Sequence, residues 1–417
     1  MLRRFAGALL VVVPTVANAF EAVDTIPYPS RSRFPAYPAE PTRPATFWAQ
    51  AGVMYDSNPF RLPSGLDPQA FLRGERYDTI MRAGIGAGYD QRIFGRQNLF
   101  LSARGDYYDY VDYSEMDHFA YRLNGEWRSE FGNDFSTVFG AERAKRLVAP
   151  EEIRTPVATF VTGDRFYGSA AYRLLADWRV RLSGEAAKSR REGGARLPLE
   201  LEAKSGTAGI DYVTPLGNAF GVEVRRADGE ATLPEDVPVF GFDTAEYTER
   251  EVSGTLSYGL GEMLRVSGRL GRTNREYVIF PGRDFDGTTY RAAVEYLPGN
   301  KTILGMDVYR TPVSIIDVAA SHVLVTGTSF TVSWAPTVKL VFQGRMIHER
   351  RQYSEPASAA ADGALDETSR IFRLGAGWEP RRFIELSTGL EYGERSTNAL
   401  FRDYDYWQVS LNAATRF

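Results

Sequence analysis

Apolar and polar residues alternate with a period of two along much of this chain. Residues 407–417 show the pattern most clearly, and one parity there is apolar apart from a threonine: Trp407, Val409, Leu411, Ala413, Thr415 and Phe417. The other parity is almost entirely polar: Gln408, Ser410, Asn412, Ala414 and Arg416. A period of two predicts a β-strand with one apolar face and one polar face.

The same alternation recurs in four further segments: Phe119–Arg128, Arg179–Ala187, Leu264–Leu270 and Phe383–Tyr392. A soluble β-rich periplasmic protein is one explanation, but its sheets would turn their apolar faces into a core. So many strands would need a very large core, whereas this chain is rich in glycine, with 39 residues. A membrane barrel needs no such core, because alternate residues of each strand face lipid. A final strand that ends in Phe417 also resembles the closing strand of bacterial outer-membrane β-barrels.

Turn signals divide the chain into strands joined by alternately short and long connections. We expect eight short ones, at Arg92–Arg96, Phe131–Asn133, Ala176–Asp177, Pro215–Asn218, Gly259–Glu262, Pro298–Asn300, Ala335–Thr337 and Glu379–Arg381. We expect nine long ones, at Pro59–Gly74, near Ser114, and at Leu147–Gly163, Arg191–Leu199, Glu230–Thr244, Tyr277–Gly287, Thr311–Ala320, Tyr353–Asp366 and Ser396–Phe401. These connections predict about 18 strands, or 16 or 20 if one hairpin is misassigned. Short periplasmic turns and long extracellular loops are typical of bacterial barrels.

Aromatic residues gather near the predicted strand ends. Five tryptophans lie beside short turns or at the start of the first strand: Trp48, Trp127, Trp178, Trp334 and Trp378. Tyrosines gather at the other ends: Tyr55, Tyr77, Tyr107, Tyr108, Tyr110, Tyr113, Tyr247, Tyr309, Tyr404 and Tyr406. We interpret them as two aromatic belts at the two membrane interfaces. The predicted fold is thus all-β, a transmembrane antiparallel β-barrel in the outer membrane of a Gram-negative bacterium.

The amino-terminal region predicts export. Residues 1–19 have a positive start, an apolar middle and a small-residue cleavage site at Ala17-Asn18-Ala19, as in a secretory signal peptide. Residues 20–45 are rich in proline, which predicts an extended periplasmic leader. That leader is an unstructured spacer, a docking arm for a periplasmic partner or a plug for the lumen. Residues 46–417 then form the barrel. The absence of cysteine excludes disulfides and thiolate metal sites.

Charged residues occupy the parity that would face the lumen. The arginines at these positions are Arg82, Arg104, Arg122, Arg128, Arg179, Arg181, Arg225, Arg265, Arg269, Arg291, Arg345 and Arg373. They alternate along the chain with carboxylates such as Asp106, Glu223 and Glu391. One interpretation is a ladder of mutually paired charges that keeps a water-filled interior solvated. The other is a polar path along which an anionic or polyhydroxylated molecule moves.

The sequence predicts no enzyme and no cofactor. The three histidines, His118, His322 and His348, are scattered and have no matching Ser/Asp arrangement. The run Asp284-Phe285-Asp286-Gly287 is either a turn or an extracellular calcium site. The near-neutral balance, with a formal net charge of −4, argues against a nucleic-acid partner.

The first predicted strand and the residues after it carry the most specific motif. The run Tyr55-Asp56-Ser57-Asn58-Pro59-Phe60-Arg61-Leu62 resembles EpsL-type outer-membrane proteins, which are encoded with exopolysaccharide biosynthesis genes. The matching positions are Tyr55, Asp56, Asn58, Phe60 and Arg61, and Pro59 departs from the leucine expected there. The resemblance implies a role in polymer secretion. A strand-ending turn is the alternative explanation of the motif.

Three functions follow as hypotheses. The main one is a passive channel that secretes an exopolysaccharide made by a periplasm-spanning assembly. A porin for small solutes or anions is the alternative, and a structural or adhesive barrel that acts through its loops is the second alternative. The expected partners are outer-membrane lipid, the exopolysaccharide chain, the periplasmic export machinery and the barrel-assembly machinery. Phe417 is expected to serve closure and lipid contact.

Overall fold

A computed structural model describes residues 44–69, 74–148, 158–193, 200–232, 244–278, 284–313, 323–353, 366–398 and 402–417. The predicted signal peptide and all but the end of the proline-rich leader lie outside these residues. Within the described chain there are eighteen strands and one short 3₁₀ helix, η3 (Ser114–Met116). None of the described residues forms a helix long and apolar enough to cross a membrane.

The strands follow one another at close intervals. They are β1 (Ala45–Asp56), β2 (Asp78–Phe94), β3 (Gln97–Tyr110), β4 (His118–Phe131), β5 (Phe135–Leu147), β6 (Phe160–Leu175), β7 (Trp178–Glu192), β8 (Glu200–Val213), β9 (Ala219–Thr232), β10 (Thr244–Leu260), β11 (Leu264–Tyr277), β12 (Phe285–Gly299), β13 (Thr302–Val313), β14 (Val323–Thr337), β15 (Leu340–Tyr353), β16 (Asp366–Arg381), β17 (Ile384–Thr397) and β18 (Tyr404–Arg416).

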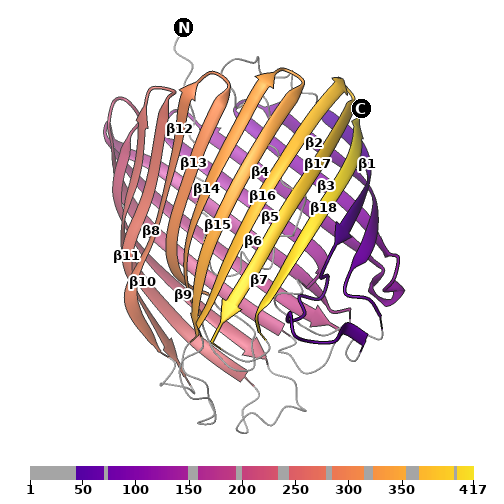
Figure 1. The fold of residues 1–417 in the computed structure, drawn as a ribbon. Coiled ribbons are helices and arrows are strands. Elements are labelled where there is room, and N and C mark those ends of the chain that lie inside the picture. Colours follow the sequence, from indigo (N-terminus) through magenta and orange to yellow (C-terminus); the bar gives the residue numbers. More distant parts are fainter. Residues whose placement is uncertain are drawn as a thin grey trace.

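All eighteen strands belong to one closed antiparallel sheet (Figure 1). Each strand pairs with its neighbours in sequence, and β1 pairs with both β2 and β18. The register of the closing pair sets Trp48 opposite Arg416 and Asp56 opposite Gln408. At the carboxyl end, Phe417 and Phe47 exchange backbone hydrogen bonds of 2.8 and 3.2 Å. The predicted 18-strand barrel is confirmed.

The two ends of the barrel differ in the length of their connections. At one end, eight connections of two to five residues join β2 to β3, β4 to β5 and so on to β17. Four of these turns contain a glycine with φ between +54° and +85°, a backbone conformation that glycine adopts without strain. Nine longer connections lie at the other end. We assign the short turns to the periplasmic side, as in other bacterial barrels.

Three of the predicted short turns were placed too early. Pro298, Pro336 and Pro380 lie inside β12, β14 and β16, and the turns follow them. Each proline comes two residues after an aromatic residue, and the pairing register shifts at each one, as in a β-bulge. Proline has no N–H to give to a sheet ladder, so a bulge tolerates it within a strand. The residue before each proline instead donates its backbone N–H to the preceding turn, over 2.8 or 2.9 Å.

The outer face of the barrel is apolar. Large side chains there stay exposed in the isolated chain, among them Ile85 (71%), Phe166 (62%) and Leu270 (61%). The inner face is polar, and most of its charged side chains are buried or half-buried. This inverts the pattern of a soluble protein and is the pattern of a barrel whose outer face contacts lipid. The chain is therefore a transmembrane β-barrel of the outer membrane of a Gram-negative bacterium.

The aromatic belts are only partly as predicted. Trp127, Trp178, Trp334 and Trp378 point outward near the short turns, between 40% and 48% exposed. Trp48 points inward, because its neighbour Phe47 has the outward parity. Its indole lies over Gly86 on β2, where an added Cβ would be 2.3 Å from the ring.

Most of the tyrosines predicted for the other belt also face inward. Tyr55, Tyr77 and Tyr107 are exposed outside, whereas the inward-facing or buried ones are Tyr108, Tyr110, Tyr113, Tyr247, Tyr309, Tyr404 and Tyr406. Five of these seven rings contact a charged side chain, whereas Tyr110 packs against His118 and Tyr113 against Phe60.

Candidate channel lumen

The structure places all twelve predicted lumen arginines on the inner face of the sheet. Their parity follows from the outward neighbours on the same strands, such as Leu123 beside Arg122 and Leu270 beside Arg269. Eleven of the twelve form an ion pair with a carboxylate. The inner face is therefore mostly a network of paired charges.

The longest run of pairs crosses five strands, from β7 to β11. It links six side chains in the order Arg179, Asp211, Arg181, Glu223, Arg269 and Glu251, over 2.7–3.4 Å. The side chain of Asp211 is only 2% exposed and receives two guanidinium groups. Buried charges of this kind need a partner, because an unpaired one is strongly destabilising. These arginines therefore hold the wall together.

Two smaller networks have the same form, in which two arginines share one carboxylate. Arg225 and Arg275 both bind Glu249 close to the extracellular end, and Arg275 is fully buried beneath the ring of Tyr247.

On β2 and β3, Arg82 and Arg104 both bind Asp106, at 3.0 and 2.7 Å. The amide of Gln50 on β1 also donates to this carboxylate.

Arg345 on β15 is the exception among the twelve. Its side chain is exposed to the interior and forms no ion pair with any described residue. Across the strand pair it faces Arg373 on β16. Arg373 is bound by Glu391, and that carboxylate also accepts the hydroxyl of Tyr406, at 2.6 Å. Arg345 thus adds an uncompensated positive charge to a stretch of wall that is otherwise neutralised.

Exposure along the inner face changes from one end to the other. Near the short turns, the side chains of Arg128 and Arg265 are 59% and 57% exposed although they point inward. Near the long connections, the side chains of Arg275 and Glu367 are completely buried. The inward side chains are therefore open to solvent near the short turns and packed against one another near the long connections.

The motif that follows β1 belongs to the packed side chains near the long connections. Arg61 binds Asp56 at 2.9 Å, both side chains are at most 4% exposed, and the guanidinium stacks on the ring of Tyr406, 3.5 Å from its centroid. Asn58 bonds both backbone groups of Leu62 and also the carbonyl of Asp405 on β18.

Arg61 has a φ of +52°, unusual for a residue with a side chain, so these contacts hold it in place. We call Asp56, Asn58 and Arg61, with the part of β18 that they contact, the rim latch.

The remaining motif residues divide between the two sides of the wall. Phe60 is 3% exposed and packs edge-on against Tyr113, with ring centroids 4.8 Å apart. Leu62 and Met116 complete this cluster, which reaches Leu147 at the end of β5. Tyr55 points outward, and its ring centroid lies 5.9 Å from that of Tyr77. Within the described residues, the motif thus orders the extracellular rim and lies away from the solvent-filled part of the lumen.

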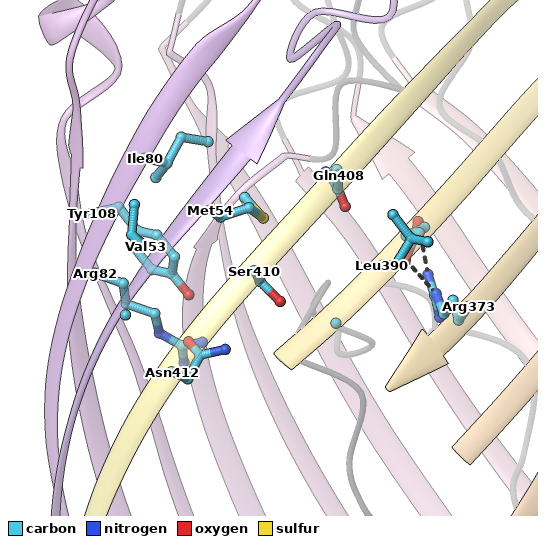
Figure 2. Close-up of a pocket in the computed structure, with 13 residues that line it drawn as sticks. Val53, Met54, Ile80, Arg82, Tyr108, Arg373, Leu390, Gln408, Ser410 and Asn412 are labelled. Carbon is cyan, nitrogen blue, oxygen red and sulfur yellow. Dashed lines mark hydrogen bonds and ion pairs between the residues drawn. The ribbon is translucent and has the colours of Figure 1, made fainter. Parts of the chain in front are cut away.

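A pocket of about 90 Å³ opens at the seam where the sheet closes (Figure 2). Its polar side chains come from β2, β3, β16, β17 and β18: Arg82, Tyr108, Arg373, Glu391, Gln408, Ser410 and Asn412. Gly52 and Gly389 also line it. Figure 2 shows Arg82 and Asn412 turned toward the same part of the wall. The charges of both arginines are already balanced by Asp106 and Glu391.

The other predicted chemical groups serve local structure where the chain is described. His118 is buried, stacks on Tyr108 with ring centroids 4.7 Å apart, and contacts the carbonyl of Met116 through Nδ1. His348 points outward, and His322 lies outside the described residues.

In the Asp284–Gly287 run, Asp284 accepts the backbone N–H of Tyr277 while Asp286 points outward to Arg272. The described residues include no group of three or more side chains suited to a metal ion.

Comparisons with known proteins give only distant likenesses. No family model matches the chain, and no curated protein matches its sequence. The structure of OpdK from Pseudomonas aeruginosa with vanillate shares 10% identity at a TM-score of 0.48, covering 89% of this chain and 99% of that one. OccK2 (OpdF) from the same organism shares 12% identity at a TM-score of 0.47, covering 89% and 97%.

The ferric enterobactin receptor PfeA, also from Pseudomonas aeruginosa, shares 6% identity at a TM-score of 0.44, covering 89% and 80%. At these values the likeness does not extend to substrates or to individual residues.

Proposed function

We propose that this barrel is a diffusion channel for small polar solutes that favours anions. The observation that carries the proposal is the exposed guanidinium of Arg345, which lies opposite Arg373 on the inner wall and forms no ion pair with any described residue. A single positive group in a water-filled passage attracts anions and repels cations. At about 4 Å in water the attraction of one unit charge is about 1 kcal/mol, which raises the local anion concentration about fivefold.

The pairing of the other arginines sharpens this proposal. Because eleven guanidiniums are bound by carboxylates, neutralising one of them would unbalance a carboxylate and disturb the wall. Arg345 can be neutralised without leaving a buried charge. It is therefore the arginine whose loss should change ion selectivity and leave the fold intact.

The test is the reversal potential of purified barrels in planar bilayers under a KCl gradient. Arg345→Gln should shift the reversal potential toward that of a nonselective pore. Arg350→Gln is the matched control, because Arg350 lies on the same strand, points outward and carries the same charge. An Arg345→Gln channel with unchanged selectivity, or a wild-type barrel with no conductance at all, would refute the proposal.

Secretion of an exopolysaccharide is the second candidate function. Two observations favour it: the resemblance of residues 55–62 to EpsL-type proteins, and an interior that is solvated toward the periplasm, from which a polymer would enter. A periplasmic export assembly would then be the partner. Deletion of the gene in the native bacterium should abolish extracellular polymer, and normal polymer levels in the deletion strain would exclude this function.

A further inference from the structure

Three uncharged polar side chains stand in a row on the inner face of β18. Gln408, Ser410 and Asn412 alternate with the outward-facing Val409 and Leu411, so all three point into the lumen. They line the pocket at the seam, and Figure 2 shows them on the same strand. Successive inward residues of a strand lie about 7 Å apart, so the row extends about 14 Å along the wall. We call these three residues the β18 row.

Glycines beside the row leave it accessible. In the register of the sheet, Gly52 on β1 lies opposite Asn412, and Gly389 on β17 lies opposite Ser410. The amide of Asn412 occupies the place where a Cβ on Gly52 would stand. Ser410 and Asn412 thus each have a neighbour without a side chain, and both are half-buried rather than covered.

The β18 row carries hydrogen-bonding groups that the wall does not use. Within the described residues, the side chains of Ser410 and Asn412 form no hydrogen bond. Gln408 is 8% exposed and donates to Asp56 of the rim latch at 2.7 Å, whereas no described residue donates to its amide oxygen. A hydroxyl and an amide can each donate and accept, so the row offers both kinds of group to a molecule in the pocket.

The charged side chains of the pocket are already engaged with one another. Arg82 binds Asp106 at 3.0 Å, and Arg373 binds Glu391. These ion pairs fix the two sides of the pocket, and a ligand need not break them to reach the β18 row. The groups that remain open for recognition are therefore uncharged, which suits hydroxyl groups better than a charged group.

We propose that the pocket binds one ring of a small, free saccharide. The hydroxyl groups of the sugar exchange hydrogen bonds with the β18 row, and its C–H groups contact Met54 and Ile80, which supply apolar surface. The pocket has room for about six water molecules, which suits a single ring, and the rim latch adjoins its extracellular end. This inference rests on the proposed function, because a solute reaches the pocket through the lumen.

The test measures sugar binding to the purified, folded barrel in an amine-oxide detergent, which has no sugar headgroup to compete. Glucose, galactose and mannose are the probes in saturation-transfer difference NMR, and the wild-type barrel should bind at least one of them. The double variant Ser410→Ala/Asn412→Leu should bind that hexose about tenfold more weakly, because two hydrogen-bonding side chains are lost. The matched control is Ser102→Ala/Asn124→Leu, which changes the same residue types at an inward-facing register pair of β3 and β4 outside the pocket and should keep wild-type affinity.

Four results would overturn the proposal. None of the three hexoses binds, or the double variant binds as tightly as the wild type while its migration in unheated SDS gels shows a folded barrel. Succinate, an anion without hydroxyl groups, displaces the hexose as effectively as a second hexose does, which would show that the pocket selects charge. Maltotriose binds more tightly than the hexose, which would show that the site takes a chain. Should the double variant not fold, Ser410→Ala alone should bind the hexose about threefold more weakly.

This experiment can fail separately from the test of the proposed function. Binding in detergent needs no conducting pore, so a barrel that binds a hexose but carries no current would refute the channel and leave the saccharide site standing. A selective channel that binds no hexose would do the reverse.

Discussion

Replacing Arg61 by methionine tests whether the rim latch is held by its buried charges. Asp56, whose side chain is 3% exposed, then loses the guanidinium that balances its charge. The side chain of Gln408 and the backbone N–H of Asn58 still donate hydrogen bonds to it, at 2.7 and 2.8 Å. Removing one partner of a buried ion pair costs about 3–5 kcal/mol. The two remaining hydrogen bonds favour the lower end, and the lost stacking on Tyr406 adds about 1 kcal/mol. The latch should therefore be weakened by about 4 kcal/mol.

Hydrogen exchange measures this opening directly. The backbone N–H groups of Asn58 and Leu62 are bonded within the latch, so their protection reports its local stability. A loss of about 4 kcal/mol corresponds to exchange about 1,000-fold faster in peptides covering residues 55–64, with strands such as β13 unchanged. If protection falls by less than tenfold, the ion pair does not hold the latch.

A double-mutant cycle separates charge from packing. Combining Asp56→Asn with Arg61→Met removes the unpaired buried charge. The double variant should therefore lose much less stability than the sum of the losses in the two single variants. If the effects of the two changes simply add, then the loss in Arg61→Met comes from packing alone.

Two further predictions concern a glycine and a tyrosine. Gly393→Ala should destabilise the barrel by about 1–3 kcal/mol, because the new Cβ would lie 2.3 Å from the ring of Tyr406. The measurement is the urea midpoint of unfolding in vesicles. The control is Gly206→Ala, whose new Cβ would have no atom within 4 Å. Burial raises the pKa of Tyr113 to about 12. The folded rim thus favours the neutral phenol. The stability of the rim, measured as hydrogen-exchange protection, should be constant below about pH 10 and fall as the pH rises through 12. The Tyr113→Phe variant should not show that fall.

The strand pattern could be predicted because it is local. Alternation of apolar and polar residues fixes which side of a strand faces lipid, so the inward placement of Arg122 or Arg269 follows from the residues beside it. The same rule applied to β1 would have placed Trp48 inside, since Phe47 and Val53 share the other parity. The error came from judging an aromatic residue by its distance from a turn alone.

The pairing of the arginines could not be predicted, because it depends on register between strands. Arg181 reaches Glu223 from two strands away, and Arg345 differs from Arg373 only in what lies opposite and beside it. The proline bulges at Pro336 and Pro380 were missed for a similar reason, because proline read alone indicates a turn. A repeated aromatic residue two positions earlier was the available signal.

The seam between β1 and β18 has a consequence for the order of assembly. Every other adjacent pair of strands joins neighbours in the sequence, so hairpins can form as the chain emerges. The ring itself can close only when the 13 residues of β18 arrive. Until then β1 is an unpaired edge, and exposed strand edges invite pairing with other chains. The edge of β1 therefore stays open to pairing with other chains until β18 arrives, and the rim latch, which bonds to β18, can form only at the final step.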